Sequence, residues 1–148
     1  MAINHRPVKA LCDSGCVATS ISEKFARKLG LQITPSDQSI KLVSANQTSI
    51  ENMGNADIEI CIQGLTIPYR VMVLKNLVTP VVLGQDFFLD TNSVINYGSH
   101  TITMNLFDNL ICAPLTPQSH VASRVKLSQS VVIPPRTEAL IHVDIPKK

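Results

Sequence analysis

The sequence predicts a mainly β domain that contains one or two short helices. Apolar and polar residues alternate over residues 56–62 and again over residues 67–73, which is the period of half-buried strands. Segments rich in glycine, asparagine and serine separate such stretches and are typical of turns. Of the 148 residues, 45% are hydrophobic and only 16% are charged, so the chain has enough apolar side chains to bury a core.

Composition and charge exclude several functional classes. A net charge of +2 without a basic run, together with the absence of tryptophan, argues against a surface for nucleic acid or for an anionic membrane. The longest apolar runs are about four residues, too short for a membrane span or a signal peptide, so we expect an intracellular, cytoplasmic protein. The four cysteines form no zinc motif and the histidines are not clustered, so neither a metal nor a cofactor is expected.

The first elements along the chain are a strand and a helix. Residues 7–12 alternate loosely and then stop at Asp13-Ser14-Gly15, which favours a turn. A helix is expected over residues 21–29, because Ser20 and Glu23 have the spacing of a capping box. The strand therefore places the aspartate in a loop before the helix.

Three antiparallel strands are expected next. Residues 39–42 and 56–62 indicate two strands joined by a polar hairpin at residues 44–49. Gln63-Gly64 then marks a tight turn before the strand at 67–73.

A strand, a glycine and a helix follow. Residues 81–83 form a short apolar run that ends at Gly84, and residues 85–90 have the pattern of a short helix. Residues 93–96 and 101–104 flank a polar segment whose length predicts another hairpin.

The composition along the chain predicts that it consists of three parts. The compact domain is expected over residues 1–107, because Pro114 and Pro117 lie among small polar residues and indicate a linker over 108–123. Residues 124–148 alternate again and predict a β-like connector.

A lone Asp-Ser-Gly is common in turns, so its context matters. The segment Ala10-Leu11-Cys12-Asp13-Ser14-Gly15 resembles the catalytic loop of retropepsin-type aspartic proteases, particularly those of Ty3/gypsy-like retrotransposon polyproteins. The similarity covers about residues 3–106, and further stretches match in the same order: residues 19–31, 81–88, 94–97 and 101–102. Residues 132–137 resemble the connector that precedes the reverse transcriptase in such polyproteins.

This resemblance implies a retropepsin-like closed β-barrel, with one lobe per chain, that acts as a homodimer. Hydrolysis of a peptide by water needs a base and an acid, and two neighbouring carboxyl groups that share one proton supply both. The chain contains only one Asp-Ser-Gly. Two copies of Asp13 would therefore have to meet on a two-fold axis.

The resemblance also implies roles for single residues. Asp13 would be catalytic, the Ser14 hydroxyl would bond to the partner loop, and Gly15 would allow close backbone approach. Simple turn capping is the alternative role for Ser14. Leu83 and Gly84 match the second, structural motif of the family.

Two interpretations are possible for the expected flap, for Cys16 and for Asp86. The expected substrate-binding flap is the tip of a polar hairpin and consists of Ala45, Asn46, Gln47 and Thr48. This tip contains no glycine, and an ordinary exposed hairpin would have the same sequence pattern. Cys16 stands where the family usually has alanine, and we expect a small buried residue or, if its pKa were low, a site of oxidation. Asp86 is expected to cap the short helix or to pair near it, rather than to serve as a second acid.

These observations leave three possible functions. The first is a dimeric aspartic endopeptidase that cleaves extended peptides of its own polyprotein, in the cytoplasm or in virus-like particles, without nucleic acid, membrane, metal or cofactor. The alternative is a non-catalytic dimerisation or peptide-binding module derived from a retrotransposon protease. The third is a plain β-barrel binding protein with a chance motif, which would make the ordered matches a coincidence.

Overall fold

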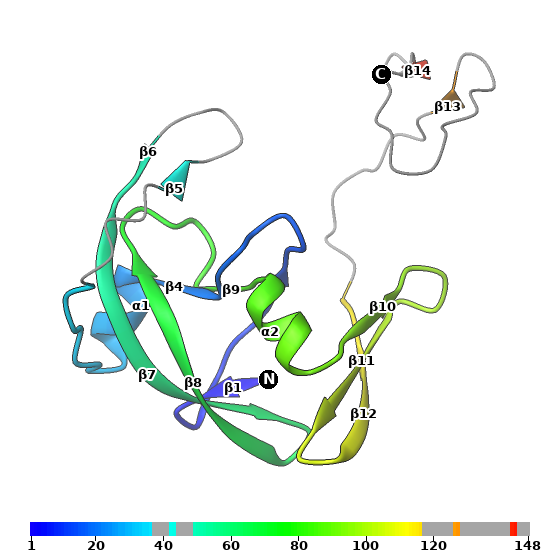
Figure 1. The fold of residues 1–148 in the computed structure, drawn as a ribbon, viewed down its shortest axis with the longest axis horizontal. Coiled ribbons are helices and arrows are strands. Elements are labelled where there is room, and N and C mark those ends of the chain that lie inside the picture. The colour runs from blue at the N-terminus through cyan, green and yellow to red at the C-terminus, as the bar shows by residue number, and fades with distance from the viewer. Residues whose placement is uncertain (37–41, 44–48, 117–125, 128–142, 145–148) are drawn as a thin grey trace. The chain divides into compact units, whose positions relative to one another are not determined.

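The computed structural model (Figure 1) describes residues 1–36, 42–43, 49–116, 126–127 and 143–144. The chain divides into two compact units, Met1–Thr116 and Pro117–Lys148. In the second unit, the strands β13 (Lys126–Leu127) and β14 (Val143–Asp144) pair antiparallel. The first unit contains the Asp-Ser-Gly loop.

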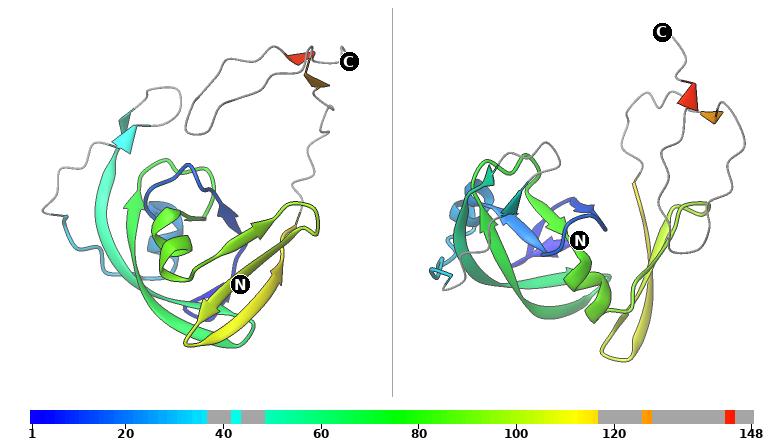
Figure 2. Two further views of the ribbon diagram at one scale, coloured as in Figure 1. Left: turned by 45° about the vertical axis from the view of Figure 1, so that its right-hand side comes forward. Right: turned by 45° about the horizontal axis from the view of Figure 1, so that its top comes forward.

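A seven-stranded sheet forms most of the first unit, with the strand order β2-β1-β7-β8-β4-β9-β3. The long strands of this sheet are curved (Figures 1 and 2). Most neighbours are antiparallel, but β4 pairs with β8 in parallel, and so does β3 with β9. The strands are β1 (Ala2–Ile3), β2 (Arg6–Pro7), β3 (Ala10–Cys12), β4 (Ser20–Ser22), β7 (Asn52–Ile62), β8 (Leu65–Leu74) and β9 (Val81–Leu83).

The remaining elements of this unit are two smaller sheets and two short helices. The sheets are β10 (Val94–Asn96), β11 (Thr101–Leu106) and β12 (Asn109–Pro114), and the pair β5 (Leu42–Val43) and β6 (Ser49–Ile50). The helices are α1 (Glu23–Lys28) and α2 (Gln85–Asp90). Among the described residues, no helix has the length and the apolar character that a membrane crossing needs.

Strand alternation produces the core. Along β7 the side chains of Ile58 and Ile60 are buried while those of Asp57 and Glu59 are exposed, because successive residues of a strand face opposite sides. The largest fully buried side chain is that of Phe87 on α2. The apolar face of the curved sheet is thereby covered by α2 and by one face of β11.

The mainly β class with one or two short helices that the sequence predicts is confirmed. The predicted tight turn at Gln63-Gly64 joins β7 to β8, and both residues have positive φ, 48° and 83°. The strand at 81–83, the helix at 85–90 and the hairpin with its turn at 97–100 are also present. Most of the segment 39–42 lies outside the described residues.

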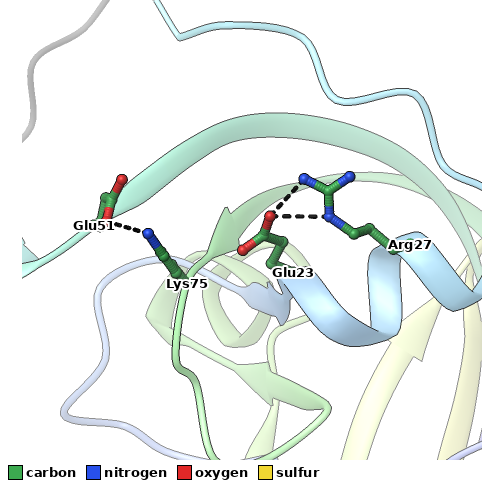
Figure 3. A network of polar contacts seen from close by, with 4 residues as sticks. All are labelled: Glu23, Arg27, Glu51 and Lys75. Atoms are coloured by element: carbon green, nitrogen blue, oxygen red, sulfur yellow. Dashed lines mark hydrogen bonds and ion pairs between the residues drawn. The ribbon is translucent and has the colours of Figure 1, made fainter.

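The helix expected over residues 21–29 begins later, at Glu23. Ser20 belongs to β4, which pairs with β8 and β9, so sheet pairing overrides the local helical pattern. Ser22 is the actual N-cap, and its Oγ accepts a hydrogen bond from Phe25 N at 3.1 Å. Within the helix Arg27 forms an ion pair with Glu23 (Figure 3).

The linker expected over residues 108–123 begins with a strand instead. Residues 109–114 form β12, which pairs with β11 along its whole length. The connecting turn is made by Phe107 and Asp108, with φ of 49° and 60°, and contains no glycine, which is why the sequence pattern did not indicate it. The domain boundaries as a whole stay a prediction.

Candidate active site

Asp13 directly follows β3, which pairs in parallel with β9. The register places Cys12 beside Leu83, and the backbone N–H of Asp13 continues this pairing by donating to the Leu83 carbonyl at 3.0 Å. The sheet thereby fixes the backbone of Asp13, while its side chain is exposed in the single chain. Such a carboxyl group is accessible to a substrate or to a second copy.

A tight turn shapes the loop after Asp13. Its Oδ1 accepts a hydrogen bond from Gly15 N at 2.9 Å, and its carbonyl accepts one from Cys16 N at 3.1 Å. A Cβ at Gly15 would lie 3.2 Å from the same Oδ1, so a larger residue would crowd the carboxylate. The Ser14 hydroxyl has no hydrogen-bond partner among the described residues, and Asp13 rather than Ser14 caps the turn.

The first residue of α2 holds the loop from the other side. The Gln85 backbone N–H donates to the Cys16 carbonyl at 2.8 Å, and its side-chain Nε2 donates to the Ser14 carbonyl at 2.8 Å. Gln85 thus bonds to Ser14 and to Cys16, the residues on either side of Gly15.

Asp86, the second residue of α2, holds the strand that follows the loop. Its Oδ1 accepts hydrogen bonds from Thr19 N at 2.8 Å, from Thr19 Oγ1 at 2.7 Å and from Phe87 N at 2.8 Å. Thr19 is buried and also accepts a bond from Gly84 N at 3.0 Å. The N-cap of α2 is Gly84, which makes no side-chain cap bond, so Asp86 pairs near the helix, mainly with Thr19, and its bonds do not fit a second catalytic acid.

Gly84, just before α2, lies close to the backbone of residues 16–18. A Cβ at this position would be 2.7 Å from the Cys16 carbonyl oxygen and 2.8 Å from the Ala18 carbonyl carbon. Backbone atoms cannot move aside as a flexible side chain can, so only glycine fits.

The other end of α2 is tied to β8 and β11. Tyr69 Oη donates to Asp90 Oδ2 at 3.0 Å, and its ring packs edge-on against Phe87 with centroids 5.5 Å apart. Burial, assisted by the Asp90 carboxylate, raises the pKa of Tyr69 well above its ordinary value of 10.0. The carbonyl of Thr91, just after the helix, accepts a bond from Asn105 N at 2.7 Å.

The comparisons with known proteins fit this geometry. A family model described as gag-polyprotein putative aspartyl protease matches residues 1–90. The chain belongs to this family. Among solved structures, the gag-type protease domain is similar to the retroviral protease-like domain of Ddi1 from Leishmania major, with 20% identity, a TM-score of 0.59, and coverage of 81% of this chain and 93% of that chain.

A second solved structure is the EIAV protease complexed with the inhibitor HBY-793, with 20% identity, a TM-score of 0.48, and coverage of 60% of this chain and 80% of that chain. No curated protein matches the chain. The family and the Ddi1 likeness confirm a retropepsin-like aspartic protease domain.

In the protease domain Cys16 directly follows the Asp13-Ser14-Gly15 loop, called the catalytic-type loop here. The Cys16 thiol donates to the Ala18 carbonyl at 3.1 Å and is half-buried. Burial is the main cause that raises the pKa of the Cys16 thiol above 9.0, and the carboxylates of Asp13 and Asp86 act in the same direction. A raised pKa contradicts the low-pKa, oxidation-sensitive alternative.

The protease domain brings together the predicted residues Asp13, Ser14, Gly15, Leu83 and Gly84. The predicted flap residues lie outside the described residues, and the strands β5 and β6 on either side of them pair antiparallel. Within the described part of the chain, no three His, Cys, Asp or Glu side chains form a metal site. No pattern in the sequence indicates the hydrogen bond between Gln85 and Ser14.

Proposed function

We propose that the chain is an aspartic endopeptidase that acts as a homodimer. The observation that carries this proposal is the exposed Asp13 carboxyl group at the end of β3, in a loop whose backbone is held by β9 and α2. A fixed backbone with an accessible carboxyl group is what a preorganised acid or base requires.

The chemistry requires a second copy. One carboxylate takes a proton from water, which attacks the peptide carbonyl carbon, while the partner carboxyl group donates its proton to the carbonyl oxygen. Two carboxyl groups a few ångströms apart retain one proton between them, because like charges at that distance repel. Asp86 does not serve as the partner, because its Oδ1 accepts three hydrogen bonds within the domain.

In the proposed dimer the two Asp13 side chains meet on a two-fold axis. The Ser14 hydroxyl, which has no partner among the described residues, bonds to the loop of the other copy, and Gly15 leaves room for that approach. The flap residues Ala45, Asn46, Gln47 and Thr48 close over the substrate, whose backbone binds as an added strand.

The proposed substrate is an extended peptide with apolar side chains near the cut, within the retrotransposon polyprotein that contains the domain. In this proposal the protease acts inside the cell, in the cytoplasm or in virus-like particles. In this proposal the protease domain predicted over residues 1–107 extends through β12, and a linker and a connector toward a reverse transcriptase follow it.

The test compares three proteins on a diverse peptide library at mildly acidic pH. The wild type should cleave and should be inhibited by a statine-type transition-state analogue. Asp13→Asn should dimerise without cleaving. The matched control is Asp57→Asn, because Asp57 is an exposed aspartate on β7 whose ion pair with Arg70 is 3.9 Å long, and it should cleave normally.

Two outcomes would overturn the proposal. Equal cleavage by the wild type and by Asp13→Asn would reject the mechanism. If all three proteins dimerise and bind peptides without cleaving any, the domain is a non-catalytic binding module.

A further inference from the structure

Val17 is an exposed apolar residue just after the catalytic-type loop. Its relative exposure is 69%, and only Cys16 separates it from that loop. Single exposed valines are common on protein surfaces and need no functional explanation by themselves. What distinguishes Val17 is its distance from Asp13 and the bonds that hold its backbone.

The turn of the catalytic-type loop keeps Val17 near Asp13. The bond from Cys16 N to the Asp13 carbonyl closes a four-residue β-turn, in which the first and the fourth Cα atoms lie within about 7 Å of each other. The Cα atom of Val17 is about 3.8 Å further along the chain. The Cα atoms of Asp13 and Val17 are therefore at most about 11 Å apart.

An extended substrate allows this distance to be expressed in peptide residues. In the proposed function the bond that is cut lies at Asp13, and the peptide binds as an added strand. Such a strand advances about 3.3 Å per residue. A separation of at most about 11 Å corresponds to about three residues, so Val17 is within reach of a substrate side chain close to the cut.

Hydrogen bonds fix the backbone around Val17. The Cys16 carbonyl accepts a bond from Gln85 N at 2.8 Å, and the Val17 carbonyl accepts one from Asp86 N at 3.2 Å. The next carbonyl, that of Ala18, accepts a bond from the Cys16 thiol at 3.1 Å. Three successive carbonyl groups thus have partners, so a substrate does not have to order this segment when it binds.

The side chain of Val17 presents a stiff apolar surface. Valine is branched at Cβ and has few rotamers, so a contact with it costs little side-chain entropy. Between Ala10 and Ser22, Asp13 is the only charged residue. A cationic or anionic substrate side chain that packed on Val17 would lose water without gaining an ion pair there. The contact therefore favours an apolar substrate side chain.

We propose that Val17 is a specificity-determining residue that selects an apolar substrate side chain within about three residues of the cut. The inference rests on the proposed function and deepens it. In the proposed dimer a two-fold axis passes between the two Asp13 side chains, so the two copies of Val17 lie on opposite sides of that axis. The same preference therefore applies on both sides of the cut.

The test replaces the apolar contact by a charge of either sign. Val17→Asp and Val17→Lys are made in the full chain, and kcat/KM is measured for peptides with leucine, lysine or glutamate at each of the three positions beside the cut. Val17→Asp should lower kcat/KM for the leucine peptide about tenfold relative to the lysine peptide. Val17→Lys should do the same relative to the glutamate peptide. Ratios between peptides are compared, because a new charge near Asp13 alters its protonation equally for all of them.

Two control variants separate a contact with the substrate from other effects. Val17→Ile keeps a β-branched apolar side chain and should keep the wild-type preference. Thr66→Asp introduces the same charge as Val17→Asp at an exposed position of β8, beside the tight turn to β7, and should also keep the wild-type preference. Far-UV circular dichroism and thermal unfolding verify that each variant is folded.

A binding measurement separates this inference from the proposed function. Asp13→Asn is expected to bind peptides without cutting them, so the dissociation constants of the same peptides are measured for Asp13→Asn alone and combined with Val17→Asp or Val17→Lys. The ratios of the dissociation constants should change about tenfold, in the same directions as kcat/KM. If no protein cleaves but the affinities follow the introduced charge, Val17 contacts the peptide and the endopeptidase proposal fails.

Three results would overturn the role of Val17. If both charge variants keep the wild-type ratios among the leucine, lysine and glutamate peptides, no substrate side chain contacts this position, and the dimeric protease stands. An equal loss for all peptides in both variants would mean that Val17 only supports the loop. If the wild type neither cleaves nor binds any peptide, this inference fails together with the proposed function.

Discussion

The side chain of Gln85 donates a hydrogen bond to the backbone carbonyl of Ser14 at 2.8 Å, although the two residues are 71 positions apart. The backbone N–H of Gln85 also donates to the Cys16 carbonyl at 2.8 Å. Helix α2 is thereby connected to both sides of the turn that presents Asp13. The orientation of the carboxyl group depends on a residue that does not itself carry out the chemistry.

Replacing Gln85 by glutamate should lower kcat about tenfold and change KM little. The variant has the same shape but cannot donate to the Ser14 carbonyl, and a net hydrogen bond contributes about 0.5–1.5 kcal/mol. Steady-state kinetics on one peptide measure the effect. Gln85→Arg, which supplies N–H donors, should restore most of kcat.

Gln63 provides the matched control for that substitution. Its side-chain Nε2 also donates to a backbone carbonyl at 2.8 Å, that of Cys112, far along the chain from the catalytic-type loop. Gln63→Glu should cost a similar amount of stability in urea unfolding and leave kcat unchanged. An equal loss of kcat in both variants would show that Gln85 contributes only to general stability.

Asp86 should tolerate asparagine but not alanine. The amide oxygen of asparagine can accept the bonds from Thr19 and Phe87, whereas alanine leaves the buried Thr19 N–H without a partner. We expect Asp86→Ala to lose about 1–3 kcal/mol of unfolding free energy for each unsatisfied group, measured by urea denaturation. Asp86→Asn should keep most of the activity. A stable but inactive Asp86→Asn protein would indicate instead that Asp86 is a catalytic acid.

Gly84→Ala should destabilise the domain by about 1–3 kcal/mol or more, as overpacking does. The new methyl group would meet the Cys16 carbonyl oxygen at 2.7 Å, so the loop has to move away from α2. Gly98→Ala is the control, because its Cβ would lie 3.4 Å from its nearest neighbour, Asn96 Oδ1. Thermal unfolding at one protein concentration should separate the two variants by several degrees.

The stability of the domain should fall at alkaline pH. The folded state keeps Tyr69 protonated above its ordinary pKa of 10.0. The folded chain therefore binds more protons than the unfolded chain as the pH rises past that value, and the unfolding free energy declines. Between about pH 9 and about pH 11 the decline should be steeper for the wild type than for Tyr69→Phe. Identical slopes in denaturant titrations would contradict the raised pKa.

Local patterns in the sequence predict much of this fold. Alternation and turn residues predict the β7–β8 hairpin, and the apolar run before Gly84 predicts β9 and α2. The errors come from long-range pairing and from turns without glycine. Ser20 joins a sheet rather than a helix, and Phe107 turns the chain where no sequence pattern indicates a turn.

The candidate site, like the fold, is predictable from the sequence only in part. The motif around Asp13 and the resemblance that it carries are visible in the sequence, and so is the glycine at position 84. The bond between Gln85 and Ser14 has no sequence pattern, because nothing local relates residues so far apart. Likewise, only the strand register, which pairs Val94 with Thr103 and Leu110 with Asn105, shows that Val94 and Leu110 lie on the same side of their sheet.

The parallel pairing of β3 with β9 also determines when the domain becomes complete during its synthesis. Leu83 leaves the ribosome long after Cys12, and at about 5–20 residues per second the delay is about 4–14 seconds. During that interval the nascent chain contains Asp13 but not the strand and helix that hold its backbone. Closing so long a loop is also a slow folding step. Under the proposed function, the emerging polypeptide would therefore be protected against premature self-digestion.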